Sequence, residues 1–277
     1  MNFKDCIDSY PFILMEGALG ERLKREFDLD ISGTVAMADL IYQQKGRMAL
    51  KTLWNEYMDI AHRYQLPFLA TTPTRRANKE RVYMAGYNES IITDNVDFLR
   101  TIKETANVNM YIGGLMGCKG DAYTSERALN QEEAIAFHSW QASLFKSVGV
   151  DFLYAGIMPV LSEAIGMAVA MSDTDIPYII SFTIQRNGKL IDGHTINDAI
   201  YYIDNHVSNK PVCYMTNCVH PDIVYEALSH KFNQTQMVKN RFWGIQANTS
   251  RLSYKELDGA KNLRTSSAVD LGKAILR

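Results

Sequence analysis

The stretch 211-PVCYMTNCVHPDIVYEAL-228 predicts a strand followed directly by a helix. Apolar residues run up to Asn217-Cys218, and His220-Pro221 then opens an amphipathic segment. Cys218 therefore lies at the end of the predicted strand, where the loops begin. A cysteine in this place is either a small apolar residue of the core or a thiol that faces a pocket. Other features of the sequence are needed to decide between these two interpretations.

The same pattern of apolar run, polar loop and amphipathic stretch extends along the whole chain. Buried parallel strands have continuous apolar sequences rather than alternating ones. The other predicted strands are 13-ILMEG, 68-FLATT, 110-MYIGGL, 152-FLYAGI, 178-YIISFTI and 243-WGIQAN. The clearest helix is 132-EEAIAFHSWQASLFKSVG-149, where Gly149 stands at the expected helix end. We predict seven β/α units without linkers, in a single domain over residues 1–277.

Alternating strands and helices favour a parallel sheet, either an open doubly wound sheet or a closed barrel. No Gly-x-Gly-x-x-Gly follows a predicted strand, which argues against a dinucleotide-binding fold. We therefore expect an α/β protein with a (β/α)8 TIM-type barrel, of which the eighth strand is missing from the given chain. The last eleven residues, 267–277, are expected to be the helix after the seventh strand. Either the barrel closes in another way or the natural chain continues.

Composition and charge exclude several classes of protein. The chain has 277 residues, 47% of them hydrophobic. Its net charge is −2, so it has no excess of positive charge that would bind nucleic acid or an anionic membrane. The longest apolar run, 152-FLYAGIMPVL, is about half a membrane span. The N-terminus has acidic residues where a signal peptide would be apolar. The four cysteines are sparse and irregularly spaced, which favours a reducing compartment, and we expect a cytoplasmic protein.

Active-site residues of β/α barrels come from the carboxyl ends of the strands and the loops after them. Polar candidates at these places are Glu16, Gly17, Thr72, Cys118, Ser181, Asn217, Cys218, His220 and Asn248. The set lacks facing carboxylate pairs, a Gly-x-Ser-x-Gly elbow and a His-Glu-x-x-His helix, so glycosidase, serine hydrolase and zinc protease chemistry are disfavoured.

Several of these residues have a purely structural interpretation as well. An acid in an apolar strand, such as Glu16, needs either an ion-pair partner or a ligand. Thr72 could cap the next helix, and His220 could be a helix cap rather than a ligand. Cys213 falls inside its strand and is expected to pack in the core.

Taken together, six segments resemble the homocysteine S-methyltransferase family, in the same order along nearly the whole chain. They are 14-LMEGALGERL, 70-ATTPTRRA, 113-GGLMGCKGDAY, 181-SFTIQRNGKLIDGHTINDAI, 217-NCVHP and 244-GIQANTS. The resemblance implies a homocysteine-binding barrel. None of the segments is diagnostic by itself, and their collinearity carries the argument.

The resemblance also implies the chemistry. Members of the family bind zinc through three cysteines, one after strand six and an adjacent pair after strand eight, so Cys218 would be the first zinc ligand and a catalytic residue. A zinc-bound thiol is held deprotonated, so homocysteine would attack an activated methyl group on a sulfonium, ammonium or folate donor and give methionine. Glu16 would face the substrate amino group. The other substrate-binding residues would be Gly17, Thr72, Ser181, Asn217 and Asn248.

Two departures from the family pattern keep an alternative open. The cysteine pair is absent up to residue 277, and Gly156 stands where the family commonly has an acid. The alternative is a divergent, non-catalytic barrel of the same family that binds a small metabolite or a partner without metal. A lyase with Glu16 as its base ranks last, since no lysine or second acid assists it at the strand ends. A barrel one strand short would expose sheet edges, so a homo-oligomer is an open expectation.

Overall fold

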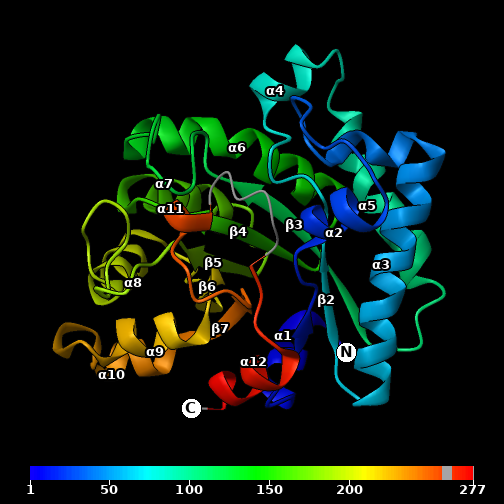
Figure 1. The fold of residues 1–277 in the computed structure, drawn as a ribbon. Helices are drawn as coiled ribbons and strands as arrows, with labels where there is room; N and C mark the ends of the chain where they lie inside the picture. Colours follow the sequence, from blue (N-terminus) through cyan, green and yellow to red (C-terminus); the bar gives the residue numbers. More distant parts are fainter. Residues whose placement is uncertain (258–263, 277) are drawn as a thin grey trace. The chain divides into compact units, whose positions relative to one another are not determined.

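The computed structural model describes residues 1–257 and 264–276, in which strands alternate with helices along the chain (Figure 1). The seven strands form one sheet in the order in which they occur in the sequence. They are β1 (Leu14–Met15), β2 (Phe68–Thr71), β3 (Met110–Gly117), β4 (Phe152–Met158), β5 (Tyr178–Phe182), β6 (Cys213–Val219) and β7 (Phe242–Ala247). β1 pairs with β2, β2 with β3, β5 with β6 and β6 with β7, each in parallel. The predicted parallel strands are thus confirmed, and the described residues contain no eighth strand.

The chain divides into two compact units. The first comprises Met1–Met116, Ala136–Tyr154 and Thr174–Pro177, and the second Gly117–Ile135, Ala155–Asp173 and Tyr178–Arg277. Helices α1 (Phe3–Ser9), α2 (Leu19–Glu26), η1 (Ala38–Tyr42), α3 (Gln44–Arg63), α4 (Lys79–Met84), α5 (Ser90–Lys103) and most of α6 (Gln131–Val148) belong to the first. Helices α7 (Leu161–Ser172), α8 (Ile196–His206), α9 (Pro221–Ser229), η2 (Lys231–Asn233), α10 (Gln236–Arg241), α11 (Tyr254–Leu257) and α12 (Ala268–Ile275) belong to the second. The single domain expected over residues 1–277 stays a prediction.

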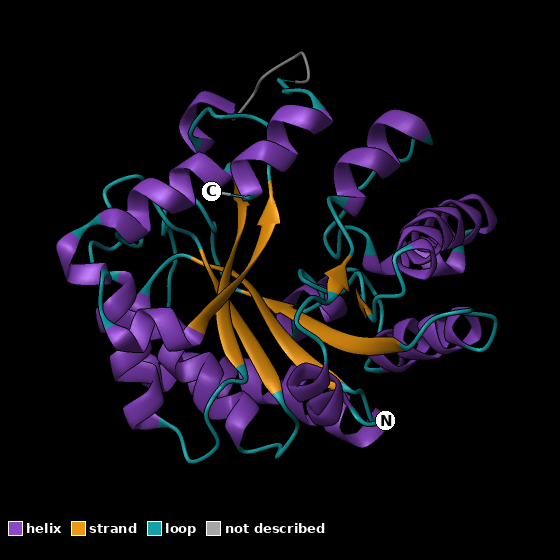
Figure 2. Ribbon diagram, turned by 90° about the horizontal axis from the view of Figure 1, so that it is seen from below, coloured by secondary structure: helices purple, strands orange, loops and turns teal. Residues whose placement is uncertain are grey.

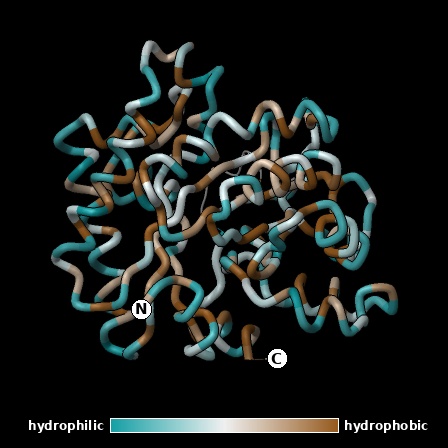
Figure 3. The backbone as a smooth tube through the Cα atoms, turned by 180° about the vertical axis from the view of Figure 1, so that it is seen from behind, coloured by the Kyte–Doolittle hydropathy of each residue, from teal (hydrophilic) through white to brown (hydrophobic). Residues whose placement is uncertain are grey.

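Three of the strands are almost wholly apolar because both of their faces are covered, whereas β1 and β7 are only partly buried. Every residue of β2, β4 and β5 is buried. Figure 2 shows the strands and helices and the loops that join them, and Figure 3 shows the hydrophobic stretches recurring between hydrophilic ones along the tube. Continuous burial leaves no polar face on these strands, which is the pattern of a parallel sheet under helices.

Local signals set the ends of several helices. The helix predicted over 132–149 is α6, and Gly149 follows it with a φ of +81°, the left-handed conformation that glycine adopts at low cost. Thr195 and Asp198 form a capping box at the start of α8. Ser267 caps α12, which confirms the helix expected near residues 267–277. Over residues 1–257 and 264–276, no helix combines the length and apolar character needed to cross a membrane.

Aromatic rings close the core of the first unit around β3. Phe3 of α1 stacks on Phe152 with ring centroids 4.7 Å apart and meets Tyr111 edge-on. Gly113 lies directly against this group, since a Cβ built there would stand 2.4 Å from Cζ of Phe152. Gly114 is pressed against Phe145 in the same way, at 2.6 Å. These two glycines therefore leave the room that the rings occupy.

We expect Gly113→Ala to lower the free energy of unfolding by about 2 kcal/mol, because a buried methyl group would displace a packed ring. Phe152 is fully buried and stacked on Phe3, so it cannot move aside cheaply. Urea unfolding followed by circular dichroism measures the difference. Gly33→Ala is the matched control, because a Cβ there meets no atom within 4 Å. Equal stability of the two variants would contradict this account of the core.

Candidate active site

A pocket of about 370 Å³ lies in the second unit, among the loops that follow its strands. Its lining includes Tyr123, Arg186, Cys218, Ile223, Leu252 and Tyr254. Cys218 is the last residue but one of β6, and the others follow β3, β5, β6 or β7, so the lining lies at the carboxyl ends of parallel strands, where β/α barrels carry their active sites. Of the two interpretations of Cys218, the structure shows the one in which it lies in the lining of a pocket, and its catalytic and metal-binding roles stay predictions.

Cys218 has an unusual backbone for a strand residue. Its φ is +61°, in the left-handed region that non-glycine residues avoid. Asn217 pairs with Gln246 and Val219 with Ala247, so Cys218 is the extra residue of a β-bulge between β6 and β7. Such a conformation costs on the order of 1 kcal/mol or more and persists where its surroundings impose it.

Cys213, five residues earlier in the same strand, has the opposite character. It is buried at 6% exposure, and burial raises the pKa of its thiol to about 12. A thiol that stays protonated at neutral pH is neither a nucleophile nor a metal ligand. The expectation that Cys213 packs in the core is confirmed, while Cys218 is only half-buried.

Two predicted site residues, Ser181 and Asn217, contact each other directly. The Ser181 hydroxyl on β5 donates to Oδ1 of Asn217, and Nδ2 of Asn217 donates to Oε1 of Gln246 on β7 at 2.8 Å. Asn248 joins the same region through its backbone, whose N–H donates to the Val219 carbonyl at 2.8 Å. These contacts hold the segment that carries Cys218; the substrate-binding roles expected of Ser181, Asn217 and Asn248 stay predictions.

An aromatic pair stands beside Cys218 in the pocket lining. The rings of Tyr123 and Tyr254 have centroids 4.6 Å apart with planes tilted by 34°. Burial, with a contribution from the nearby Cys218, raises the pKa of Tyr254 above its usual value, so its hydroxyl stays protonated. That hydroxyl donates to the carbonyl of Asn217 at 3.3 Å. The pair thus contributes two neighbouring aromatic rings to the pocket lining, and the Tyr254 hydroxyl also holds β6.

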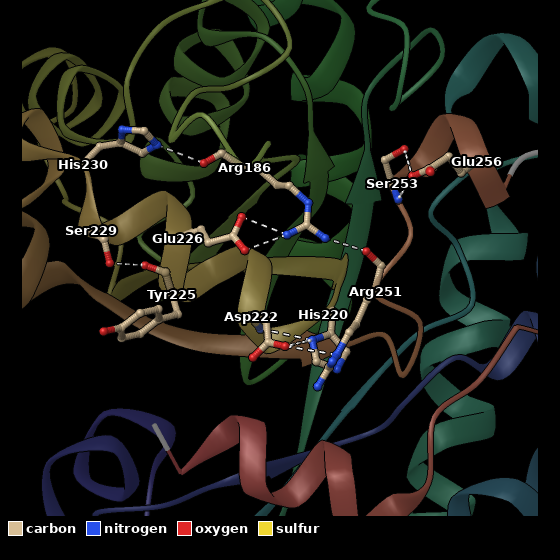
Figure 4. Close-up of polar contacts among 10 residues, drawn as sticks. All are labelled: Arg186, His220, Asp222, Tyr225, Glu226, Ser229, His230, Arg251, Ser253 and Glu256. Atoms are coloured by element: carbon tan, nitrogen blue, oxygen red, sulfur yellow. Dashed lines mark hydrogen bonds and ion pairs between the residues drawn. The ribbon is translucent and has the colours of Figure 1, made fainter.

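Charged side chains tie the segments around the pocket to α9 (Figure 4). Arg186 donates through Nη1 to both carboxylate oxygens of Glu226 at 2.8 Å and through Nη2 to the Arg251 carbonyl at 2.7 Å. Arg251 in turn pairs with Asp222 at 3.1 Å. These exposed ion pairs contribute little stability each. Together they link the loops after β5 and β7 to one helix.

His220 serves as the cap of α9. Its Nδ1 accepts the backbone N–H of Asp222 at 3.1 Å, and the side chain is fully buried. Burial lowers its pKa, which favours the neutral imidazole that can accept this bond. Of the two interpretations of His220, the structure shows the helix cap.

Glu16, Gly17 and Thr72 lie in the first unit. Oε1 of Glu16 accepts the Thr71 backbone N–H at 2.9 Å and the Thr71 hydroxyl. A Cβ at Gly17 would stand 2.8 Å from the Tyr57 hydroxyl, so a side chain there would collide. The Thr72 hydroxyl accepts the Leu115 N–H at 3.1 Å. These contacts join neighbouring strand ends; the substrate-binding roles expected of the three residues stay predictions.

Burial gives Glu16 an unusual titration. The side chain is 3% exposed, and loss of solvation raises its pKa from 4.5 to about 7, against the opposing effect of the Thr71 hydrogen bonds. The folded protein therefore binds this proton more tightly than the unfolded chain does. The stabilisation is fully present below pH 4.5 and is lost as the pH rises through about 7.

We expect Glu16→Gln to remove this pH dependence, because glutamine keeps the acceptor for Thr71 and cannot ionise. Between pH 4 and pH 8 the wild type should lose roughly 3 kcal/mol of unfolding free energy relative to the variant. Denaturant titrations at several pH values measure the difference, and the exposed Glu104→Gln controls for the loss of one carboxylate. A difference between Glu16→Gln and the wild type that does not change with pH would contradict the raised pKa.

The model of the family described as homocysteine S-methyltransferase matches residues 13–269. The chain belongs to the homocysteine S-methyltransferase family. Homocysteine S-methyltransferase YbgG of Bacillus subtilis is 21% identical over 217 residues, which cover 72% of this chain and 67% of that protein. The resemblance of the six motifs is thereby confirmed as membership in a family of enzymes.

Solved structures show the shared fold. The homocysteine methyltransferase MmuM from Escherichia coli, in the form described as metallated, has a TM-score of 0.67 and 18% identity, covering 81% of each chain. The oxidized form has a TM-score of 0.66 and 19% identity, covering 81% of this chain and 80% of that one. With the sequential parallel strands, this similarity confirms the TIM-type barrel as the fold class.

The zinc site expected from the family is not complete in the described part of the chain. Residues 1–257 and 264–276 contain no group of three His, Cys, Asp or Glu side chains that could hold a metal ion. A structural or catalytic zinc ion needs at least three protein ligands, and Cys218 supplies one thiolate. The described residues therefore do not fit a bound zinc ion.

The sequence did not indicate most of the pocket lining, including Tyr123, Arg186 and Tyr254. Tyr123 and Tyr254 lie six or more residues past the ends of their strands, beyond the positions that strand ends alone indicate. Arg186 lies closer to the end of its strand, four residues after Phe182. An aromatic residue in each of two strand-end loops was the available signal, and only the fold brings the two rings together.

Proposed function

We propose that this protein transfers a methyl group from a donor to the thiol of homocysteine or a related thiol, giving methionine in the first case. The observation that carries the proposal is the Cys218 thiol in the lining of the pocket at the strand ends. Membership in the homocysteine S-methyltransferase family supports the choice of substrate. The family supplies the chemistry, and the pocket supplies a place where the Cys218 thiol could take part in it.

The transfer requires few groups from the protein. The substrate thiol gives its proton to solvent before the transfer, the thiolate sulfur then forms the new bond to the methyl carbon with a lone pair, and the old bond from that carbon to the donor breaks with its electron pair left on the donor. Ile184, Val219 and Ile223 give the pocket an apolar wall that displaces water from the sulfur. The Tyr123–Tyr254 pair adds a flat surface against which a substrate can be oriented.

We expect Cys218→Ala to reduce kcat/KM for methionine formation at least a hundred-fold, because the residue's sulfur lies where the reacting thiol binds. Homocysteine is assayed in parallel with sulfonium, quaternary ammonium and methylfolate donors. Cys213→Ala is the matched control, since it removes a buried thiol from the same strand. Full activity of Cys218→Ala would contradict the proposed site.

Zinc remains part of the proposal as the cofactor that the family implies, with Cys218 as one ligand. The support is the family and a solved relative described as metallated. No step above depends on it, because the described residues do not complete a site. The two further cysteines expected after an eighth strand stay a prediction.

Metal analysis of the purified natural protein tests the cofactor. We expect one zinc per chain in the wild type and none in Cys218→Ala, because loss of one thiolate ligand weakens a zinc site strongly. Cys213→Ala should keep the metal. Stoichiometric zinc that survives Cys218→Ala would contradict the role of this cysteine.

The second candidate is the divergent barrel that binds a small metabolite or a partner without metal and without turnover. The absence of a metal-holding group among the described residues favours it, as does Gly156 in place of an acid. A wild-type protein without zinc that fails to turn over any donor class would establish this alternative.

We further infer a cytoplasmic protein, on the support of four cysteines that form no disulfide. The net charge of −2 supports partners that are small molecules rather than nucleic acid or an anionic membrane. β7 pairs with β6 only, among the described strands, so association of copies through this edge stays an expectation.

A further inference from the structure

The direction of the Cys218 side chain is not the one that a regular strand would give it. Successive residues of a strand point to opposite faces, so Cys218 would share a face with Tyr214 and Thr216. Tyr214 on that face donates its hydroxyl to Asp204 of α8 at 2.7 Å. An unbroken β6 would therefore turn the thiol toward the helix layer. The bulge takes Cys218 out of this alternation and places it in the pocket lining.

The residue before Cys218 is fixed from both sides. Asn217 is 7% exposed, and its side chain lies between Ser181 of β5 and Gln246 of β7. The three side chains form a line of hydrogen bonds across three neighbouring strands, which we name the Asn217 clamp. The clamp sets the register Asn217 opposite Gln246 at the place where the bulge begins.

The residues after Cys218 are fixed as well. The Val219 carbonyl accepts the Asn248 N–H at 2.8 Å, and His220 caps α9. β6 is therefore held on both sides of Cys218. Between these two held places β6 has one residue more than β7. The residue between them absorbs the extra length by adopting a positive φ, which is the geometry of a bulge.

We propose that Asn217 is a positioning residue: held between Ser181 and Gln246, it imposes the left-handed backbone on Cys218 and so directs the thiol into the pocket. The inference deepens the proposed function and rests on it for the reason why the direction matters. The direction itself can be measured without any methyl donor.

The experiment measures how fast iodoacetamide alkylates Cys218, by peptide mass spectrometry across a range of pH. Gln246→Met removes the acceptor for Asn217 Nδ2, and Ser181→Ala removes the donor to Oδ1. We expect both variants to lower the pH-independent rate of the Cys218 thiolate at least ten-fold. Gln246→Glu keeps an acceptor and should restore the rate to within about three-fold of the wild type. Gln234→Met, the same change at an exposed glutamine outside the pocket, is the matched control.

Alkylation of Cys213 in the same samples shows whether a variant has lost stability or only the position of Cys218. Cys213 is buried in the same strand, so loosening of the fold would raise its alkylation, whereas loss of positioning lowers the rate at Cys218 and leaves Cys213 protected. Faster alkylation of both cysteines in the variants would mean that the clamp holds the fold and would overturn the inference. Wild-type rates at Cys218 in folded Gln246→Met and Ser181→Ala would overturn it too.

A crystal structure of Gln246→Met gives a direct second test, with φ of residue 218 expected to become negative. A φ that stays near its present +61° would overturn the inference. Slow alkylation in the variants together with a wild type inactive toward every donor would reject the proposed function and support the positioning role.

Discussion

The hydrogen bonds of the Asn217 side chain are the constraint on which the pocket depends. They join β5, β6 and β7 at the level where β6 carries one residue more than β7. A shift of one residue in a strand exchanges its two faces, so a single extra residue is enough to move a side chain from the helix layer to a cavity. The position of the Cys218 sulfur is therefore set by amide and hydroxyl groups that need not touch a substrate.

Burial distinguishes the two thiols of β6. Cys213 is enclosed, its pKa is raised to about 12, and it behaves as an apolar core residue. Cys218 lies at the pocket, next to Tyr254. The loop that carries Tyr123 is held by the fully buried Glu163. Its carboxylate accepts the Lys119 N–H at 2.7 Å and the Leu129 N–H at 3.3 Å. A buried carboxylate thus holds the loop in place, while the lining of the pocket mixes apolar residues such as Ile184 and Ile223 with polar ones such as Arg186.

Burial of Glu16 in the first unit disfavours the charged form of its carboxyl group. The Thr71 hydrogen bonds favour its charged form, yet desolvation is the larger effect and raises its pKa to about 7. A buried acid that titrates near neutral pH is typical of sites with a function, although structural networks produce it too. A side chain at the neighbouring Gly17 would collide with the Tyr57 hydroxyl, so the residues around Glu16 are also closely packed.

The sequence by itself determined the strands and favoured the barrel and the family, and the structure gave the order of the strands in the sheet. Continuous apolar runs such as 152-FLYAGI can only be buried on both faces, and local caps such as Gly149 end the helices where the pattern indicates. It also pointed to Cys218, because the ends of parallel strands meet at one edge. The tertiary structure alone decided what surrounds that thiol. A left-handed φ inside a strand, a clamp between Ser181 and Gln246, and two tyrosines brought together from distant loops all depend on contacts between segments far apart in the chain, and no local pattern encodes them.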